Sequence, residues 1–172
     1  FDFCIQEVGN HHHGTVVTSG PDRLENAGRV GIPQIVAPGA VDMVDLPAWQ
    51  TLPEAFAERP YHAHNRLIGS ITSSPERRRE VARLVGEKLG NAGARVAMLL
   101  PLQGVQEWDK PEEPLHDPEG LDALMDEMRR TLPAPVTVEE VDAPINSEAF
   151  SARALAIFDA WVSQGVIPGG KP

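Results

Sequence analysis

The chain has 172 residues, enough for one domain with a hydrophobic core, and its hydrophobic content of 41% and charged content of 23% are those of an ordinary globular protein. Its net charge of −10 disfavours binding to nucleic acids and to anionic membranes, because both carry dense negative charge. The single cysteine, Cys4, excludes an internal disulfide and favours a reducing, cytoplasmic compartment, and the lack of a long apolar run predicts no membrane-spanning segment.

Five short apolar segments predict the strands of a mostly parallel sheet. They are residues 1–3, 34–37, 67–71, 96–100 and 136–138. The fourth segment is continuously apolar, which is typical of a central strand with both faces buried. The fifth runs into Glu139 and Glu140, and we therefore expect it nearer an edge of the sheet.

Four segments between and after these strands carry helix signals. Pro21 can occupy the first position of a helix, with Leu24 facing inward. Ser74 and Asp117 each precede a proline and an acidic residue, as at a capped helix start, and the last helix is expected to begin near Ser147. Apolar residues recur at helical spacing over Val81–Leu89, Leu121–Leu132 and Phe150–Trp161.

This alternation predicts an α/β fold, in which a mostly parallel open sheet is flanked by helices in a Rossmann-like three-layer sandwich. We expect a single domain over residues 1–167 and a flexible tail over residues 168–172. The stretch Pro38–Pro60 is long for a loop, which favours a functional segment or lid. The chain begins with Phe1 rather than methionine, which we interpret as a start inside a longer protein.

The candidate site residues are the polar residues that follow the predicted strands. In open parallel sheets, ligands bind beyond the carboxyl ends of the strands. The residues selected on this ground are Glu7, Asp42, Ser73, Ser74, Gln103, Gly104 and Asn146.

The run His11–His13 allows two interpretations. Neutral imidazole is a common metal ligand, and Asp42 or Glu7 could complete a metal site. However, consecutive residues do not share a face of a regular element, so at most two of these histidines could easily bind one ion. The alternative is a solvated polar loop between Gly9 and Gly14.

The segment Thr72–Ser74 also allows two interpretations. It opens a predicted helix, where free amides and the helix dipole would favour a phosphate group. The alternative is that Ser74 simply caps the helix. Neither the P-loop pattern nor the G-x-G-x-x-G pattern is present, so any nucleotide site differs from the common glycine-rich ones.

Several motifs, in fixed order over nearly the whole chain, resemble a known family. Residues 19–24 read Ser-Gly-Pro-Asp-Arg-Leu, and residues 99–105 read Leu-Leu-Pro-Leu-Gln-Gly-Val. Further matching segments are Gly31–Gln34, Pro38–Val44, His64-Asn65, Thr72–Glu76, Asp117-Pro118 and Ile145-Asn146. Together they resemble the Tm-one-like ATP-binding proteins, a family that includes a tomato protein conferring resistance to tomato mosaic virus.

The resemblance implies that the chain is the carboxyl-terminal half of a two-part α/β protein and acts with an amino-terminal half. It also implies ATP as a cofactor, and either half could hold the nucleotide. If this half does, the phosphates are expected at the start of the Pro75 helix. Mg²⁺ would then have to separate them from Asp42 or Asp142, because like charges repel.

The resemblance also draws attention to His64, which lies in a family motif. By contrast, His11–His13 falls where the sequence departs from the family, whose threonine-rich segment is missing here. If the long segment before His64 folds over the sheet, His64 could approach Asp42 or Glu7, which would raise its pKa and suit it to acid–base chemistry. The alternative is a histidine that only orders its own loop.

The leading hypothesis is therefore a domain that binds a small molecule, with ATP and Mg²⁺ as the implied cofactors, or that acts catalytically on one. We expect a homo-oligomer without nucleic-acid or membrane partners. The candidate catalytic residues are His64, Glu7 and Asp42, and the candidate cofactor contacts are Ser73, Ser74, Gln103, Gly104 and Asn146.

The alternative hypothesis is a non-catalytic interaction module. In that case the Pro38–Pro60 segment, together with Trp49 and Trp108, would contact a protein partner. Convergence of the candidate polar residues on one pocket would favour the binding hypothesis, and scatter over the surface would favour the interaction module.

Overall fold

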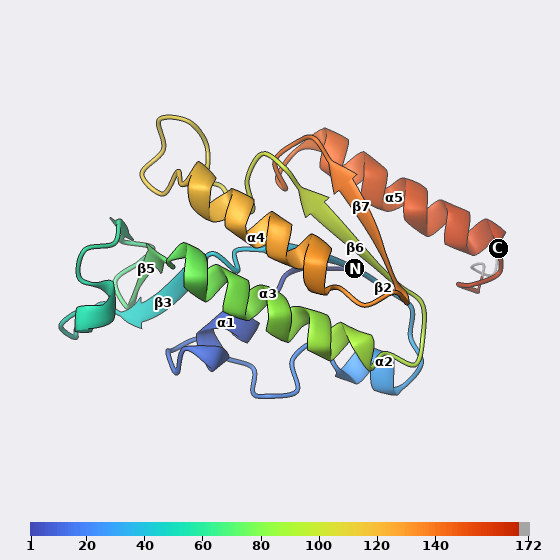
Figure 1. Cartoon of the computed structure of the whole chain (residues 1–172), viewed down its shortest axis with the longest axis horizontal. Coiled ribbons are helices and arrows are strands. Elements are labelled where there is room, and N and C mark those ends of the chain that lie inside the picture. Colours follow the sequence, from blue (N-terminus) through green and yellow to red (C-terminus); the bar gives the residue numbers. More distant parts are fainter. Residues whose placement is uncertain (169–172) are drawn as a thin grey trace.

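The computed structural model describes residues 1–168, so the predicted tail lies outside the described residues from position 169 onward. Four parallel strands form the main sheet in the order β1 (Asp2–Cys4), β2 (Gln34–Gly39), β6 (Val96–Pro101) and β7 (Val136–Val141) (Figure 1). The strand β6 is central and entirely buried, and β7 lies at an edge with a half-exposed pattern, as predicted.

Helices cover both faces of this sheet, which confirms the three-layer α/β fold. On one face lie α3 (Pro75–Gly90) and α4 (Pro118–Thr131), and on the other lies α5 (Glu148–Ser163) (Figure 1). Side chains alternate along β6: Met98 and Leu100 pack in the core under α3 and α4, whereas Leu99 packs under α5. The short helices α1 (Gln6–His12) and α2 (Asn26–Arg29) lie between β1 and β2 in the chain.

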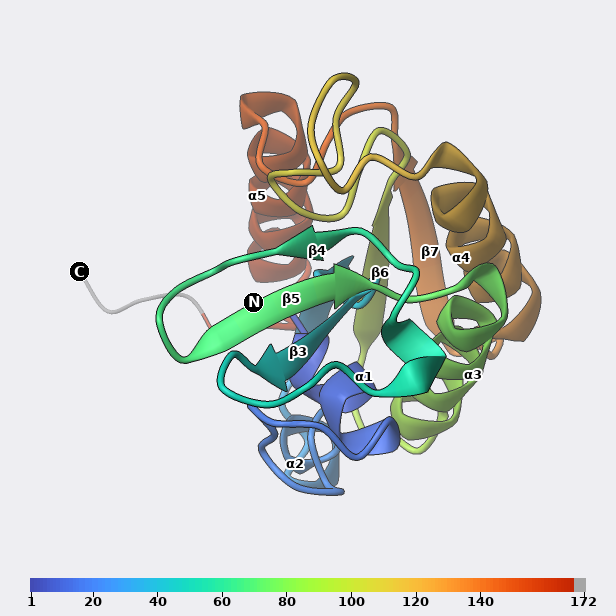
Figure 2. The same cartoon turned by 90° about the vertical axis from the view of Figure 1, so that its left-hand side faces the viewer.

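A second, antiparallel sheet projects from one end of the molecule. Its strands are β3 (Met43–Pro47), β5 (Ile68–Thr72) and β4 (Tyr61–His62), in the order β3-β5-β4 (Figure 2). The prediction that residues 67–71 join the parallel sheet is therefore wrong, and Pro38–Pro60 is not one long loop, since it contains β3 and the 3-10 turn η1 (Glu54–Phe56). A short apolar run indicates a strand but does not say which sheet it joins.

Three of the predicted helix starts are capped as expected. The hydroxyl of Ser74 accepts a hydrogen bond from the Arg77 amide at 3.4 Å, the Asp117 carboxylate accepts one from the Gly120 amide at 3.0 Å, and the Ser147 hydroxyl accepts one from the Phe150 amide at 3.1 Å.

The predicted helix at Pro21 is wrong, because residues 21–25 form a turn and α2 begins only at Asn26. Leu24 is buried, as predicted, but in the left-handed conformation with φ of 78°. An ion pair between Arg23 and Asp2 on the neighbouring strand β1 ties this turn to the sheet. Tertiary contacts here override the local helix signal.

Candidate functional site

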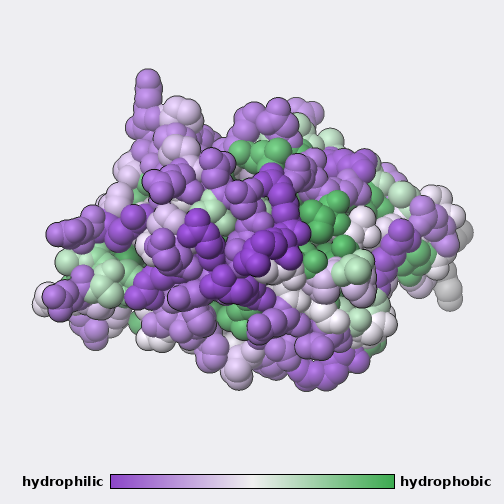
Figure 3. Space-filling model, viewed as in Figure 1, coloured by the Kyte–Doolittle hydropathy of each residue, from purple (hydrophilic) through white to green (hydrophobic). Residues whose placement is uncertain are grey.

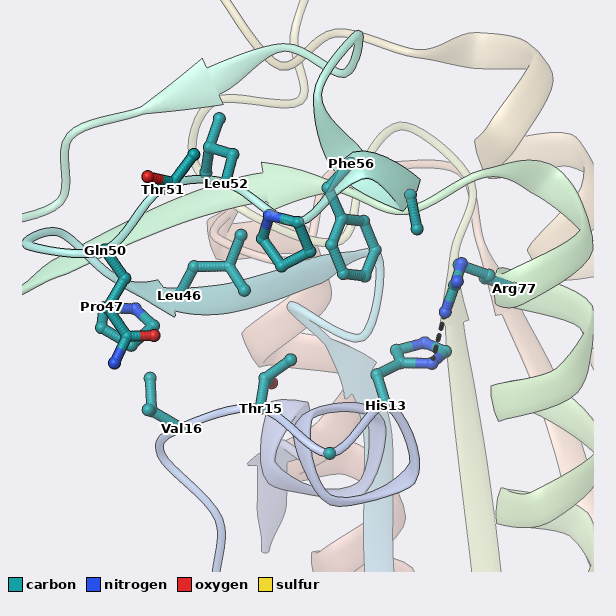
Figure 4. A pocket seen from close by; sticks show the side chains of 13 residues that line it. His13, Thr15, Val16, Leu46, Pro47, Gln50, Thr51, Leu52, Phe56 and Arg77 are labelled. Carbon is teal, nitrogen blue, oxygen red and sulfur yellow. Dashed lines mark hydrogen bonds between the residues drawn. The ribbon is translucent and has the colours of Figure 1, made fainter.

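A cavity of about 480 Å³ lies where α1, β3 and the first turn of α3 meet (Figure 4). The segment Pro38–Pro60, which was predicted to be functional, contributes to its wall through the end of β3 and residues between 50 and 56. The residues lining it are His13, Gly14, Thr15, Val16, Leu46, Pro47, Gln50, Thr51, Leu52, Pro53, Ala55, Phe56 and Arg77. We refer to it as the His13–Arg77 cavity.

His13 and Arg77 form a hydrogen-bonded pair in the wall of this cavity. Nη1 of Arg77 lies 3.2 Å from Nδ1 of His13 (Figure 4). A guanidinium group only donates, so Nδ1 must accept, and the ring proton must reside on Nε2. That Nε2 atom is buried and has no hydrogen-bond partner within residues 1–168. An acceptor is therefore missing at this position.

The charge of the cavity is opposite to that of the chain. Burial, followed by the nearby Arg77 and His12, lowers the pKa of His13 to about 4, so its ring is neutral at pH 7. Arg77 forms no ion pair with a carboxylate in the described part of the chain, and no aspartate or glutamate is found among the described residues lining the cavity. The cavity wall thus carries one positive charge without an ion pair among the described residues, in a chain of net charge −10.

The rest of the wall is divided into apolar and polar parts. Leu46 and Phe56 belong to a buried cluster of the smaller sheet, and the Arg77 guanidinium lies 4.8 Å from the centre of the Phe56 ring. Thr15, Gln50 and Thr51 supply hydroxyl and amide groups. The cavity can therefore accept a ligand with an apolar body and a polar or anionic end.

A cluster of possible metal ligands lies next to this cavity. His12 Nε2 is 3.3 Å from Glu80 Oε2, and one ligand atom each from His12, His13 and Glu80 lie within 4.8 Å of one another. Two of the three consecutive histidines thus come together, as the sequence allowed. Their carboxylate neighbour is Glu80 of α3 rather than the predicted Asp42 or Glu7.

Asp42 lies in a buried polar cluster between the two sheets. It is fully buried and accepts a hydrogen bond from the Gln106 amide at 3.2 Å. Burial raises its pKa to about 6, the charge of Arg78 opposes that rise, and the charge of Asp109 adds to it. Within residues 1–168, one polar atom each of Asp42, Ser73, Arg78 and Asp109 is buried without a hydrogen-bond partner.

The start of α3 is covered by arginine side chains. Arg59 Nη2 donates to the Ser73 carbonyl and to the Asp117 carboxylate, each at 3.0 Å. Arg78 Nη2 donates to the same carboxylate at 2.7 Å. Ser73 is buried beneath these groups, and Ser74 caps the helix. Only Arg77, in the first turn, extends from this helix start into the His13–Arg77 cavity.

Of the other sequence-predicted site residues, Gln103 and Gly104 after β6 lie together with Asn146 after β7, where the Ile145 amide donates to the Gly104 carbonyl at 3.0 Å, but their side chains have separate partners. Glu7 pairs with Arg23 at 3.4 Å. Gln103 donates to Asp142 at 3.0 Å, and Asn146 donates to Glu107 at the same distance. Gly104 has φ of 128° and packs against the backbone of Asp109.

His64 is exposed, and its ring lies edge-on to Trp108 at 6.0 Å between centroids. No described hydrogen bond or ion pair joins His64 to Asp42 or Glu7 in residues 1–168. Asn146 and Trp108 border a separate hollow of about 300 Å³ near the carboxyl ends of β1 and β2. The catalytic role of His64 and the cofactor role of Asn146 stay predictions.

Sequence reasoning did not select Arg77. The residue belongs to the run Arg77–Arg79, and residue type alone does not distinguish its three members. The signal that could have identified it is its place in the first turn after the Ser74 cap, beside the expected anion-binding end of the helix.

The fold and cavity define an α/β domain with a four-stranded parallel sheet, helices on both faces and a small added antiparallel sheet. Residues 1–162 match the model of the C-terminal domain of the uncharacterised protein family UPF0261, and the chain belongs to this family. This confirms the predicted carboxyl-terminal position.

Similar proteins occur in bacteria and plants. A UPF0261 protein of Brucella melitensis is 65% identical over 99% of this chain, and one of Clostridium tetani is 37% identical over 87% of it. The tomato mosaic virus resistance protein Tm-1 of Solanum lycopersicum is 29% identical over 76% of this chain, which corresponds to 17% of that protein. The chain spans 41% of the length of the Brucella protein. No helix within residues 1–168 is long and apolar enough to cross a membrane.

Proposed function

We propose that this domain binds a small organic anion in the His13–Arg77 cavity. The observation that carries the proposal is the Arg77 guanidinium, which lines the cavity without a carboxylate partner among the described residues, beside the unpartnered N–H of His13. A carboxylate or phosphate oxygen would accept hydrogen bonds from the guanidinium, and it would reach the buried Nε2–H group of His13 only if the His13 ring turned toward the cavity. Such charge-assisted bonds are short and strong.

The dimensions and polarity of the cavity agree with this ligand class. A volume of about 480 Å³ lies within the range of about 300–1,000 Å³ that is usual for small-molecule sites. The apolar side chains of Leu46, Leu52 and Phe56 would contact the body of the ligand, and Gln50 and Thr51 would contact its polar groups. One guanidinium matches a ligand with one anionic group better than a polyphosphate.

ATP with Mg²⁺ is the more specific form of this proposal. A nucleotide whose phosphates reach the start of α3 would meet Arg77 first, because Arg59 and Arg78 are already paired with Asp117. Of the two carboxylates considered as Mg²⁺ ligands, Asp42 is fully buried, and Asp142 accepts a hydrogen bond from Gln103. Further cations for a polyphosphate would then come from the amino-terminal part of the full-length protein.

The test is a ligand screen on the intact protein, with Arg77→Met and Arg79→Met compared in parallel. Arg79 is a matched control, because it lies two positions along the same helix and pairs with Glu76 at 3.7 Å, outside the cavity. The probes are short carboxylic acids, phosphate monoesters, inorganic phosphate and ATP with Mg²⁺, measured by thermal shift and calorimetry.

A ligand present at about 100 times its dissociation constant should add about 2.7 kcal/mol of stability. We expect this gain in the wild type and in Arg79→Met but not in Arg77→Met. If no probe binds, or if a probe binds Arg77→Met as tightly as the wild type, the cavity is not an anion site. Binding of ATP alone among the probes would support the nucleotide form of the proposal.

The interaction module remains a second candidate, because one end of the smaller sheet is apolar and exposed. Trp49 is 67% and Leu67 is 63% exposed, and a hydrogen bond of 3.0 Å from the Ala48 amide to the Leu67 carbonyl holds them at the same end of β3 and β5. The face carrying α3 and α4 is mainly hydrophilic (Figure 3). If this apolar end contacts another chain, Trp49→Ser should lower the oligomeric mass measured by light scattering.

A further inference from the structure

We propose that His12, His13 and Glu80 form a binding site for one divalent transition-metal ion of the zinc type, beside the His13–Arg77 cavity. One ligand atom from each residue lies within 4.8 Å of the other two. The proposal does not depend on the ligand of the cavity, because metal binding can be measured without it.

The spacing of the ligand atoms is close to that of a zinc site. With metal–ligand bonds of about 2.0–2.1 Å, two ligand atoms of a tetrahedral zinc ion are about 3.3 Å apart. His12 Nε2 and Glu80 Oε2 are already separated by 3.3 Å. The His13 nitrogen lies within 4.8 Å of both atoms, so the His13 ring must move toward them for all three ligand atoms to bind one ion.

The fold explains why two consecutive histidines can serve one ion. His12 is the last residue of α1 and His13 is its C-cap, so regular helical geometry ends between them. Both rings contact α3, where His12 meets Glu80 and His13 meets Arg77, three positions earlier on the same helix face. His11 does not belong to the cluster.

The ligand types determine which ions fit. Imidazole and carboxylate together suit Zn²⁺, Co²⁺ and Ni²⁺, whereas Mg²⁺ and Ca²⁺ prefer oxygen ligands. The side chains of His12 and Glu80 are 37% and 46% exposed, which gives the ion a path from solvent. Three protein ligands leave a fourth position for water or for another ligand, as in open zinc sites.

Arg77 competes with the metal ion for His13. An ion bound to Nδ1 takes the lone pair that now accepts from Arg77, and an ion bound to Nε2 leaves Nδ1 as an N–H group. In either case the hydrogen bond between Arg77 and His13 is lost, although the guanidinium keeps its place over the Phe56 ring. Replacing Arg77 with methionine should therefore strengthen metal binding.

The experiment measures Zn²⁺ binding to the intact, tag-free protein by competition with a chromophoric chelator. Four variants are compared with the wild type: His12→Ala, Glu80→Gln, Arg77→Met and the matched control His11→Ala. We expect one Zn²⁺ per chain, at least tenfold weaker binding in His12→Ala and Glu80→Gln, tighter binding in Arg77→Met, and binding within about twofold of wild type in His11→Ala.

Two results would overturn the proposal. One is a wild-type protein that binds no Zn²⁺ at micromolar concentration. The other is a loss in His11→Ala as large as in His12→Ala, which would indicate loose chelation by the histidine run. If a variant fails to fold, the absorption spectrum of Co²⁺ added to the wild type tests the site instead. The intense visible bands of tetrahedral Co²⁺ support the site, and the weak bands of hydrated Co²⁺ contradict it.

Discussion

Asp42 is the residue whose replacement tests the electrostatics of the buried polar cluster most directly. In Asp42→Asn the side chain keeps its shape and an oxygen that can accept the Gln106 hydrogen bond, but it cannot ionise. Burial and the nearby Asp109 oppose ionisation of Asp42, and Arg78 only partly offsets them. The neutral amide should therefore be better tolerated than the carboxylate at pH 7.

The magnitude follows from the pKa of the folded state. Burial raises the pKa of Asp42 from 3.8 to about 6, and each pKa unit corresponds to about 1.4 kcal/mol, which together give an upper limit of about 3 kcal/mol. Since the folded state binds the proton more tightly than the unfolded state, this carboxyl lowers stability as pH rises from about 4 to about 6. The free energy of unfolding of Asp42→Asn should equal that of the wild type near pH 4 and exceed it by about 1–3 kcal/mol at pH 7.

The assay is urea unfolding of both proteins between pH 4 and pH 7, reported as the difference in unfolding free energy. The difference is needed because the lowered pKa of His13 makes stability rise over part of the same range, and this contribution cancels between the two proteins. Asp122→Asn, an exposed substitution on α4, is the control and should give a difference near zero at every pH.

The reasoning would be refuted by a difference between Asp42→Asn and wild type that does not change with pH, or by one that turns against the variant as pH rises. Either result would mean that the cluster stabilises the charged carboxylate, with Arg78 outweighing burial and Asp109.

Two further substitutions test the packing of the fold by urea unfolding at pH 7. A Cβ atom added at Gly39 would overlap the Phe3 carbonyl oxygen of β1 and lie 3.0 Å from Ile145. Gly39→Ala should therefore lower the free energy of unfolding by about 1–3 kcal/mol. A change below about 0.5 kcal/mol would contradict this close approach. Ser147→Ala removes the hydroxyl that accepts the 3.1 Å hydrogen bond at the start of α5, so the free energy of unfolding should fall by about 1 kcal/mol. Unchanged stability would show that this cap is dispensable.

Local patterns were sufficient for most of the parallel sheet and its helices. The apolar run 96–100 identified the central strand, and the caps Ser74, Asp117 and Ser147 identified three helix starts, because these signals depend on interactions within a few residues. The antiparallel sheet was missed, since the pairing of β3 with β5 joins segments about 25 residues apart. Nothing in either segment alone specifies that partner.

Local patterns did not predict the candidate site either, because it also depends on contacts between segments that are far apart in the chain. Residues that follow strands were selected, yet Glu7, Asp42 and Gln103 each found a different partner, in Arg23, Gln106 and Asp142. Whether ATP binds, and where, stays a prediction.

The three consecutive arginines, residues 77–79, show which features the local sequence predicts and which depend on the tertiary structure. Their place in the first turns of a capped helix follows from the residues themselves, and the helical rotation of about 100° per residue ensures that they point in different directions. What each direction contains is decided by distant parts of the chain. Arg77 meets His13 of α1, Arg78 is buried against Asp117 of the α4 cap, and Arg79 stays at the surface with Glu76. Only the packing of α1 and of α4 against α3 gives three identical side chains three different environments.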